Sequence, residues 1–276
     1  MNWIRSILYG LISGIAEFLP ISSEAHMALA RQIFGVETVE PVRDLLVHIA
    51  ILLALLTACR NMIRSLQRDQ EMAAKAGRSG KRRRSFRGLL DIRLVKTAAV
   101  PMLIGLLLLF VTRSLANNLV TISVFLIVNG IILFVPDRMT TGNKDARSMT
   151  KLDSILMGLS GAMSVFPGIS RIGATSSMAV ARGADRHQAL NWALLLSIPA
   201  LAVIIGFDVL SLFSQGAGVG LWQNFFGYIL SAAAAFAGGY AGISLVRALT
   251  ARGNLSGFAY YSWGAGLFLF ILYLQV

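Results

Sequence analysis

The chain has 276 residues, of which 56% are hydrophobic, and it carries a formal net charge of +12 at pH 7. Its long apolar runs have no polar face, which excludes a soluble helical bundle. The positive charge is concentrated in residues 60–93 without a nucleic-acid-binding motif, which excludes RNA and DNA as partners, and the lone Cys59 excludes an intramolecular disulfide.

The first predicted element is a helix that is broken within residues 17–26, Glu-Phe-Leu-Pro-Ile-Ser-Ser-Glu-Ala-His. Pro20 and the serines after it form a polar, loop-forming stretch inside apolar sequence. Lipid tolerates a broken helix or an ionisable group only where protein or a watery cavity surrounds it. Residues 1–35 are therefore predicted to form a half-helix, a loop and a second half-helix beside a buried site.

Apolar runs that are about long enough to span a bilayer follow along the chain. They lie near 45–59, 94–111, 119–136, 189–207, 222–244 and 258–276. The basic segment 60–93 is interpreted as a cytoplasmic loop that obeys the positive-inside rule. Its run Lys81-Arg82-Arg83-Arg84 offers an alternative, which is docking to anionic lipid headgroups.

A second break lies at residues 167–175, Pro-Gly-Ile-Ser-Arg-Ile-Gly-Ala-Thr. Residues 13–23 resemble residues 160–170, and the similarity continues downstream, where 27–31 resembles 178–182. The two similar parts are collinear and each lies at a helix break, which favours an internal repeat over chance.

The expected fold is an all-α polytopic membrane protein with six transmembrane helices and two re-entrant helical hairpins in an inverted repeat. With the basic segment in the cytoplasm, hairpin 1–35 enters from outside and hairpin 152–186 from inside, so that their tips meet near the midplane. The chain is expected to form one integral membrane domain, with repeat units of about 1–118 and 119–276.

The second half-helix of each hairpin would point its N-terminus toward the bilayer centre, where free N–H groups and the positive end of the helix dipole favour an anion. Gly168 and Gly173 let the backbone approach a ligand closely, and Arg171 offers a planar fork suited to phosphate oxygens. The alternative for Arg171 is a structural ion pair with Glu17 across the two tips. The hydroxyl-rich surroundings favour a shared site for an anionic substrate.

Several residues at the two breaks could carry chemistry. Glu17, which is costly when unpaired at membrane depth, is a candidate metal ligand or general base. Ser22 and Ser23 are candidates for helix capping or for catalysis, and His26, one turn beyond Ser23, is a candidate for proton transfer. Together with Arg171 on a glycine-rich loop, the set fits phosphoryl transfer better than acyl transfer.

Three other ionisable residues are given no chemical role. His48, one turn after Asp44, is predicted to make a satisfied helix contact. His187 is predicted to be solvated at the inner surface, and Asp208 to mark the outer interface.

The two breaks, with Glu-Phe-Leu-Pro-Ile-Ser-Ser at 17–23 followed by His26, and with the motif at 167–175, resemble the undecaprenyl-pyrophosphate phosphatases, also called bacitracin-resistance proteins. The resemblance extends over nearly the whole chain, including Leu-Leu-Leu-Ser-Ile-Pro at 194–199. It implies dephosphorylation of a C55 polyprenyl pyrophosphate by an enzyme of the inner (plasma) membrane whose site faces outward. Such a reaction recycles the lipid carrier for cell-wall synthesis, assisted by a divalent cation, Mg²⁺ or Ca²⁺.

Carried over by position, the resemblance implies individual roles. Glu17 matches the second glutamate of a Glu-x-x-x-Glu element, and Ser23 and His26 match the serine and histidine proposed as nucleophile or proton-transfer groups. Arg171 matches the arginine that binds pyrophosphate. The neighbouring polar and small residues are expected to bind substrate: Ser22, Gly168, Ser170, Gly173 and Thr175.

The sequence departs from the family pattern at Ser13, Glu24, Ala25, Ile172 and Ala193. Ser13 replaces the first glutamate of the Glu-x-x-x-Glu element, and the loss of a carboxylate should weaken a site for a hard cation. Glu24, on the same loop, is expected to restore the missing charge as a second metal ligand beside Glu17.

Two other functions compete with a phosphatase. The first is a transporter or flippase of a phosphorylated polyprenyl lipid carrier, because inverted repeats with midplane sites are typical of secondary transporters. The second is a non-catalytic binding or regulatory paralogue. The expected partners are the polyprenyl pyrophosphate substrate, the membrane and a second copy of the chain in a homodimer, with no nucleic acid.

Overall fold

The computed structural model describes residues 3–34, 40–78, 92–139, 142, 144, 148–215, 221–251 and 256–275. Over these ranges the regular elements are helices joined by turns and loops, with an isolated bridge between Lys144 and Ala184, which confirms the predicted all-α class. The helices are α1 (Trp3–Phe18), α2 (Ser23–Phe34), α3 (Pro41–Ala58), α4 (Arg60–Arg78), α5 (Ile92–Leu106), α6 (Leu109–Thr112), η1 (Arg113–Asn117), α7 (Leu119–Asp137), α8 (Lys151–Ala162), η2 (Met163–Val165), α9 (Arg171–Ala181), α10 (Arg186–Gln215), α11 (Leu221–Ala251) and α12 (Ser256–Gln275).

Six helical segments within the described ranges are long and apolar enough to cross a membrane. They are Pro41–Ala58, Ile92–Thr112, Leu119–Asp137, Arg186–Ser214, Asn224–Ala251 and Ser256–Gln275. Large apolar side chains, among them Val111, Phe213 and Phe226, are exposed on the outside of the bundle, as expected for a surface in contact with lipid. The protein is therefore a multi-pass membrane protein.

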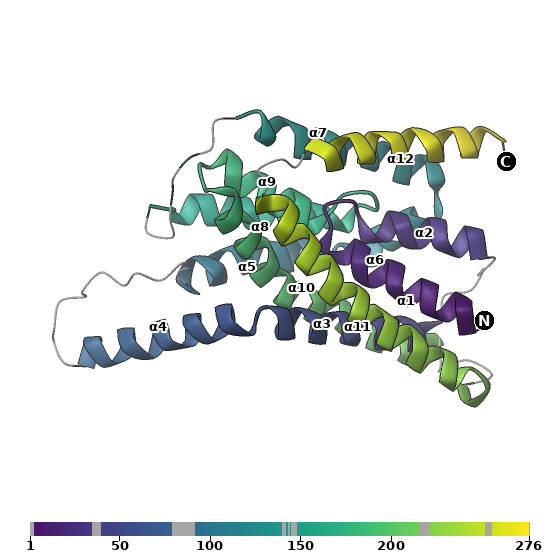
Figure 1. Cartoon of the computed structure of the whole chain (residues 1–276), viewed down its shortest axis with the longest axis horizontal. Coiled ribbons are helices and arrows are strands. Elements are labelled where there is room, and N and C mark those ends of the chain that lie inside the picture. The colour runs from purple at the N-terminus through teal and green to yellow at the C-terminus, as the bar shows by residue number, and fades with distance from the viewer. Residues whose placement is uncertain are drawn as a thin grey trace.

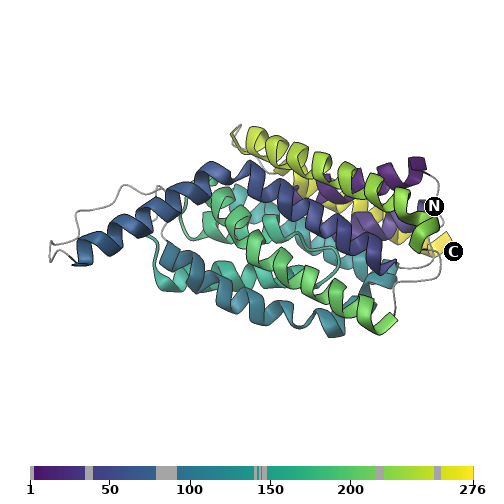
Figure 2. The ribbon, with the colours of Figure 1, turned by 90° about the horizontal axis from the view of Figure 1, so that it is seen from below.

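The basic segment 60–93, predicted as a loop, begins instead with helix α4, which projects beyond the bundle (Figures 1 and 2). Helical hydrogen bonding continues through Cys59, whose N–H donates to the Leu55 carbonyl at 2.9 Å and whose carbonyl accepts from Ile63 at 2.9 Å. Leu66 is buried against other elements, so α4 has an apolar face that a solvated loop would lack. The Lys81–Arg84 run lies outside the described residues.

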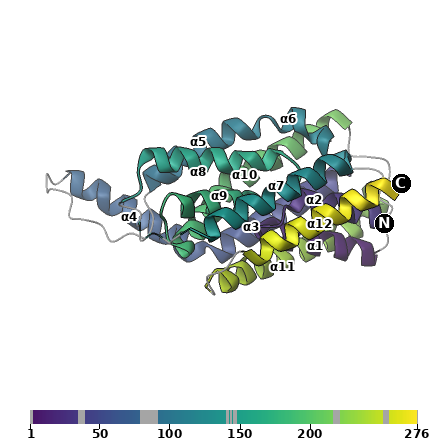
Figure 3. The same ribbon diagram turned by 90° about the horizontal axis from the view of Figure 1, so that it is seen from above.

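The chain reverses direction twice in the middle of the bundle, between α1 and α2 at residues 19–22 and between η2 and α9 at residues 166–170. Helix α1 packs mainly on α11, while α8 packs on α5, and α7 lies along α12 (Figure 3). The first helix of each broken unit therefore packs on a helix from the other half of the chain. Such reciprocal packing is expected of two related units. Re-entry from opposite membrane faces and the inverted repeat stay predictions.

The second broken unit is tied together at its two ends by Asp153, which is fully buried in the first turn of α8. Its carboxylate accepts hydrogen bonds from the Thr150 N–H at 2.9 Å and from Arg182 Nε, at the end of α9, at 2.6 Å. Burial alone would raise the pKa of Asp153, but these donors and the charge of Lys144 hold it at about 2. Asp153 thus holds the start of α8 close to the end of α9, and the loop between the two helices lies at the other end of this unit.

Candidate active site

The loops at residues 19–22 and 166–170 are joined directly by hydrogen bonds. The Gly168 N–H donates to Ser22 Oγ at 3.1 Å, and Ser170 Oγ donates to the Leu19 carbonyl at 3.2 Å. Ser22 has a φ of 67°, a left-handed conformation that costs a serine about 1–3 kcal/mol and persists only where its surroundings fix it. Here the fixing partner is the second loop.

Asn129 of α7 holds both loops at once and is fully buried. Its Nδ2 donates to the Pro20 carbonyl at 3.1 Å and to Ser262 Oγ at 3.0 Å, while its Oδ1 accepts from the Ser170 N–H at 2.9 Å. The sequence analysis missed this residue. The signal was present, because an asparagine inside the apolar run 119–136 is costly unless it is hydrogen-bonded.

The tips of the two units also meet through an ion pair. Arg171 Nη2, at the start of α9, donates to Glu17 Oε1, at the end of α1, and both side chains are buried. The ion pair expected as an alternative role for Arg171 is therefore present. Arg171 Nε and Nη1 are buried without a partner among the described residues, however, so the pairing leaves guanidinium donors available for an anion.

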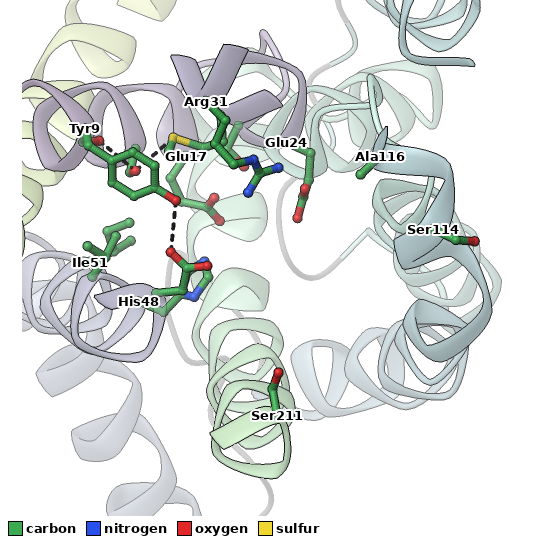
Figure 4. Close-up of a pocket in the computed structure, with 14 residues that line it drawn as sticks. Tyr9, Glu17, Glu24, Arg31, His48, Ile51, Ser114, Ala116 and Ser211 are labelled. Carbon is green, nitrogen blue, oxygen red and sulfur yellow. Dashed lines mark hydrogen bonds between the residues drawn. The ribbon is translucent and has the colours of Figure 1, made fainter. Parts of the chain in front are cut away.

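A cavity of about 340 Å³ lies beside this pair, and Figure 4 shows the side chains that surround it. Its lining comes from α1, α2, α3, η1 and the last turns of α10, at the end of the bundle opposite to α4. The polar and charged residues of the lining are Tyr9, Ser13, Glu17, Ser23, Glu24, Arg31, Asp44, His48, Ser114 and Ser211.

A second, smaller cavity of about 60 Å³ contains Arg171 and Ser170 in its lining. It shares four residues with the larger cavity, namely Glu17, Ser23, Glu24 and His48. Its remaining wall is largely apolar and is formed at the break between α5 and α6 and along α10, by Leu106, Leu109, Ile204 and Phe207. A ligand in the two cavities would therefore meet charged groups and an apolar wall together.

The predicted site residues fall into three groups. Glu17, Ser23 and Arg171 line a cavity together with Glu24 and Ser170. Four others belong to the loops or to α9 and line neither cavity: Ser22, Gly168, Gly173 and Thr175. The N–H groups of Gly168, Ser170 and Gly173 donate to Ser22 Oγ, Asn129 Oδ1 and Ser170 Oγ, which identifies these residues as the frame that positions Arg171.

His26, the third group, is turned toward α12. Its Nδ1 lies 2.8 Å from the Ser22 carbonyl oxygen, its Nε2 lies 2.6 Å from Tyr261 Oη, and its ring stacks on Tyr261. It does not line either cavity. Its role in proton transfer stays a prediction, but both ring nitrogens already have partners.

Two residues to which the sequence analysis gave no chemistry form a pair, and one of them, His48, lines both cavities. The partner of His48 of α3 is not Asp44: its Nδ1 lies 2.6 Å from Oδ2 of Asp208 on α10, and Asp208 is buried. The position of Asp208 at the outer interface stays a prediction. Asp44 accepts instead from the Tyr9 hydroxyl at 2.9 Å. The sequence did contain a signal for this pair, because an aspartate inside an apolar span, such as Asp208, needs a partner.

The fit of a divalent cation can be judged from the carboxylates. No cluster of three or more His, Cys, Asp or Glu side chains that could hold a metal is found in the described part of the chain. Ser13 donates its hydroxyl to the Tyr9 carbonyl at 2.8 Å and supplies no carboxylate. Glu17 and Glu24 nevertheless line both cavities, and Mg²⁺ is typically held by one or two carboxylates plus substrate phosphates. The donor set fits a cation that arrives with a phosphorylated substrate.

Substitution of Gly168 by alanine is expected to destabilise the protein by about 2 kcal/mol or more. Gly168 has a φ of 120°, and an added Cβ would lie 2.7 Å from Phe125 Cβ and 2.8 Å from the Ile122 carbonyl oxygen. Thermal unfolding of the purified protein in detergent measures the effect. Gly264→Ala on α12 is the matched control, because a Cβ there meets no atom within 4 Å. Equal unfolding temperatures for the two variants would contradict the prediction.

The comparisons with known proteins show the family of this chain. The sequence matches the family model described as bacitracin resistance protein BacA over residues 6–268. A relative from Carboxydothermus hydrogenoformans named undecaprenyl-diphosphatase is 30% identical, over 99% of this chain and 98% of its own length. Relatives of the same name from Methanobrevibacter smithii and Treponema denticola are 31% and 32% identical, and each match covers at least 98% of both chains. The protein belongs to the family of bacitracin resistance protein BacA.

Proposed function

We propose that this protein removes the terminal phosphate of undecaprenyl pyrophosphate, or of a closely similar polyprenyl pyrophosphate, and leaves the monophosphate for reuse as a lipid carrier. The names of its relatives support this reaction. The observation that carries the proposal is the buried guanidinium of Arg171, whose Nε and Nη1 have no partner among the described residues and which shares a cavity with Ser23. An arginine fork suits two phosphate oxygens, and the apolar wall of the same cavity suits the start of a prenyl chain.

Each element of the site has a role in this reaction. The Arg171 guanidinium binds the diphosphate and stabilises the negative charge that moves to the bridging oxygen as the terminal phosphate leaves. Ser23 lies in the first turn of α2, where the N-terminus of the helix favours an anion. Its hydroxyl either attacks the terminal phosphorus itself or holds the water molecule that attacks. Glu17 fixes the orientation of Arg171.

A divalent cation is part of the proposal, with Glu17 and Glu24 as the residues that would hold it. When bound, such a cation neutralises charge on the phosphate oxygens. We expect Glu24→Gln to raise the Mg²⁺ concentration needed for half-maximal phosphate release about tenfold, because one of two carboxylate ligands is lost. Titration of chelator-treated protein with Mg²⁺ measures this, with Glu71→Gln on α4 as the control. An unchanged Mg²⁺ requirement would remove Glu24 from the cation site.

The location of the cavities supports a site on the outer side of the inner (plasma) membrane. The larger cavity opens at the end of the bundle opposite to the basic helix α4, and the positive-inside rule places α4 in the cytoplasm. A substrate whose diphosphate is presented at the outer leaflet would reach it there. The homodimer stays a prediction.

The test is phosphate release by the purified protein in detergent with undecaprenyl pyrophosphate and Mg²⁺, together with identification of the lipid product. We expect one inorganic phosphate for each undecaprenyl monophosphate formed, over many turnovers. A folded protein that binds the lipid but leaves the diphosphate intact would contradict the proposal. The relatives' names do not favour the flippase or the non-catalytic paralogue.

A further inference from the structure

A histidine that lines both cavities, His48 of α3, is paired with a buried aspartate of α10. His48 Nδ1 lies 2.6 Å from Asp208 Oδ2, and Asp208 is buried inside the long helix α10. A carboxylate that accepts a hydrogen bond from Nδ1–H fixes the orientation of the ring. The lone pair of Nε2 is then the one that can accept a proton. The carboxylate also stabilises an imidazolium that forms when Nε2 takes a proton.

His48 shares both cavities with the groups that the proposed reaction uses. It lines the larger cavity beside Glu17 and Ser23, and it lines the smaller one with Arg171 as well. Figure 4 shows His48 on α3 across the larger cavity from Glu17 and Arg31. A phosphate held by Arg171 near Ser23 would therefore lie between the loops and His48.

The position of the other candidate histidine argues in the same direction. His26 lines neither cavity, and its nitrogens are engaged by the Ser22 carbonyl and the Tyr261 hydroxyl. The Ser22 carbonyl belongs to the strained loop residue, so His26 is placed to hold the loop conformation. His187 is exposed in the first turn of α10. Of the three histidines of the chain, His48 is the one that faces the proposed substrate.

We propose that His48 is the proton-transfer residue of the phosphatase reaction and that Asp208 is its positioning residue. The inference rests on the proposed function. As the attacking oxygen, from Ser23 or from a water held by it, forms its bond to the terminal phosphorus, its proton passes to His48 Nε2. The bond from that phosphorus to the bridging oxygen breaks, and its electron pair stays on that oxygen, which leaves as part of the prenyl monophosphate. If Ser23 itself attacks, His48 first releases this proton to solvent. Water then attacks the phosphoserine and its proton passes to His48 Nε2 as the bond from phosphorus to Ser23 Oγ breaks; His48 returns that proton to Ser23 Oγ, which gives back the serine and inorganic phosphate.

The test compares His48→Gln and His48→Ala with wild type in phosphate release from undecaprenyl pyrophosphate. Glutamine can still hydrogen-bond to Asp208 but cannot take up the proton, so we expect kcat to fall about 10²-fold or more while KM changes little. Added imidazole should restore part of the kcat of His48→Ala, which a purely structural role would not allow. Asp208→Asn should lower kcat about tenfold or more and retain KM, because the ring loses its carboxylate. His187→Gln is the matched control and should behave as wild type.

Two results would overturn the inference and leave the phosphatase intact. One is a His48→Gln variant with wild-type kcat and raised KM, which would make His48 a phosphate-binding group. The other is a large kcat loss with imidazole rescue in His26→Ala but not in His48→Ala, which would return proton transfer to His26. Absence of phosphate release by folded wild-type protein would instead overturn the proposed function itself.

Discussion

Arg171→Ala is expected to lower kcat/KM for undecaprenyl pyrophosphate about 10³-fold, the size of effect seen when a group that stabilises developing charge is removed. The side chain is buried and pairs with Glu17 through Nη2, while Nε and Nη1 have no partner in the described part of the chain. Those are the donors that a phosphate would occupy. Initial rates of phosphate release over a range of lipid concentrations give the value.

The same substitution also leaves the Glu17 carboxylate buried without its partner, which costs about 3–5 kcal/mol. Unfolding and loss of chemistry must therefore be separated. Arg171→Lys keeps the positive charge beside Glu17 but loses the planar fork, so it should retain most of the thermal stability and still lose at least about tenfold in kcat/KM. If Arg171→Lys and Arg171→Ala both fold and both turn over at the wild-type rate, Arg171 is only a structural partner of Glu17.

Ser23→Ala and Ser22→Ala are expected to differ sharply, although the residues are adjacent. Ser23 lines both cavities, so its loss should lower kcat about 10³-fold with little change in the unfolding temperature. Ser22 lines neither cavity, and its Oγ accepts from the Gly168 N–H at 3.1 Å and from the Ala25 N–H at 3.4 Å. Its loss should cost about 1–3 kcal/mol of stability, since two buried N–H groups lose their acceptor.

Parallel measurement of kcat and of thermal unfolding for the two serine variants separates the roles. Ser22→Ala should keep a larger share of the wild-type kcat than Ser23→Ala at a temperature where both are folded. The opposite pattern, with the larger kcat loss in Ser22→Ala, would move the attacking oxygen to Ser22. It would also require the loop around residue 22 to open toward the cavity.

The six spans and the two breaks could be predicted from the sequence, because the length of an apolar run and a helix-breaking proline, here Pro20 and Pro167, are local signals. The contact between Glu17 and Arg171 could be predicted as well. The two helix breaks lie at matching positions of two similar segments, which predicted that their tips meet. Both groups also need a partner at membrane depth.

The rest of the site depends on contacts that no local signal records. The sequence predicted that His48 makes a contact within its own helix, near Asp44. Its partner is instead Asp208, 160 residues away, because α3 and α10 pack together. Asn129 joins both loops only once α7 packs against them. Helix α4 was not predicted, because the high charge of its sequence indicated a solvated loop. Helical hydrogen bonds nevertheless continue from α3 into α4.

The most direct test of the central claim, that the two loops form a hydrolytic site, uses proteoliposomes that contain the purified protein and undecaprenyl pyrophosphate. Inorganic phosphate and the amount of intact diphosphate in each leaflet are measured over time, with Arg171→Lys alongside. The account predicts that the diphosphate disappears as an equal amount of phosphate is released by the wild type, and far more slowly with the variant. Movement of intact diphosphate between leaflets without phosphate release would contradict it and establish a transporter.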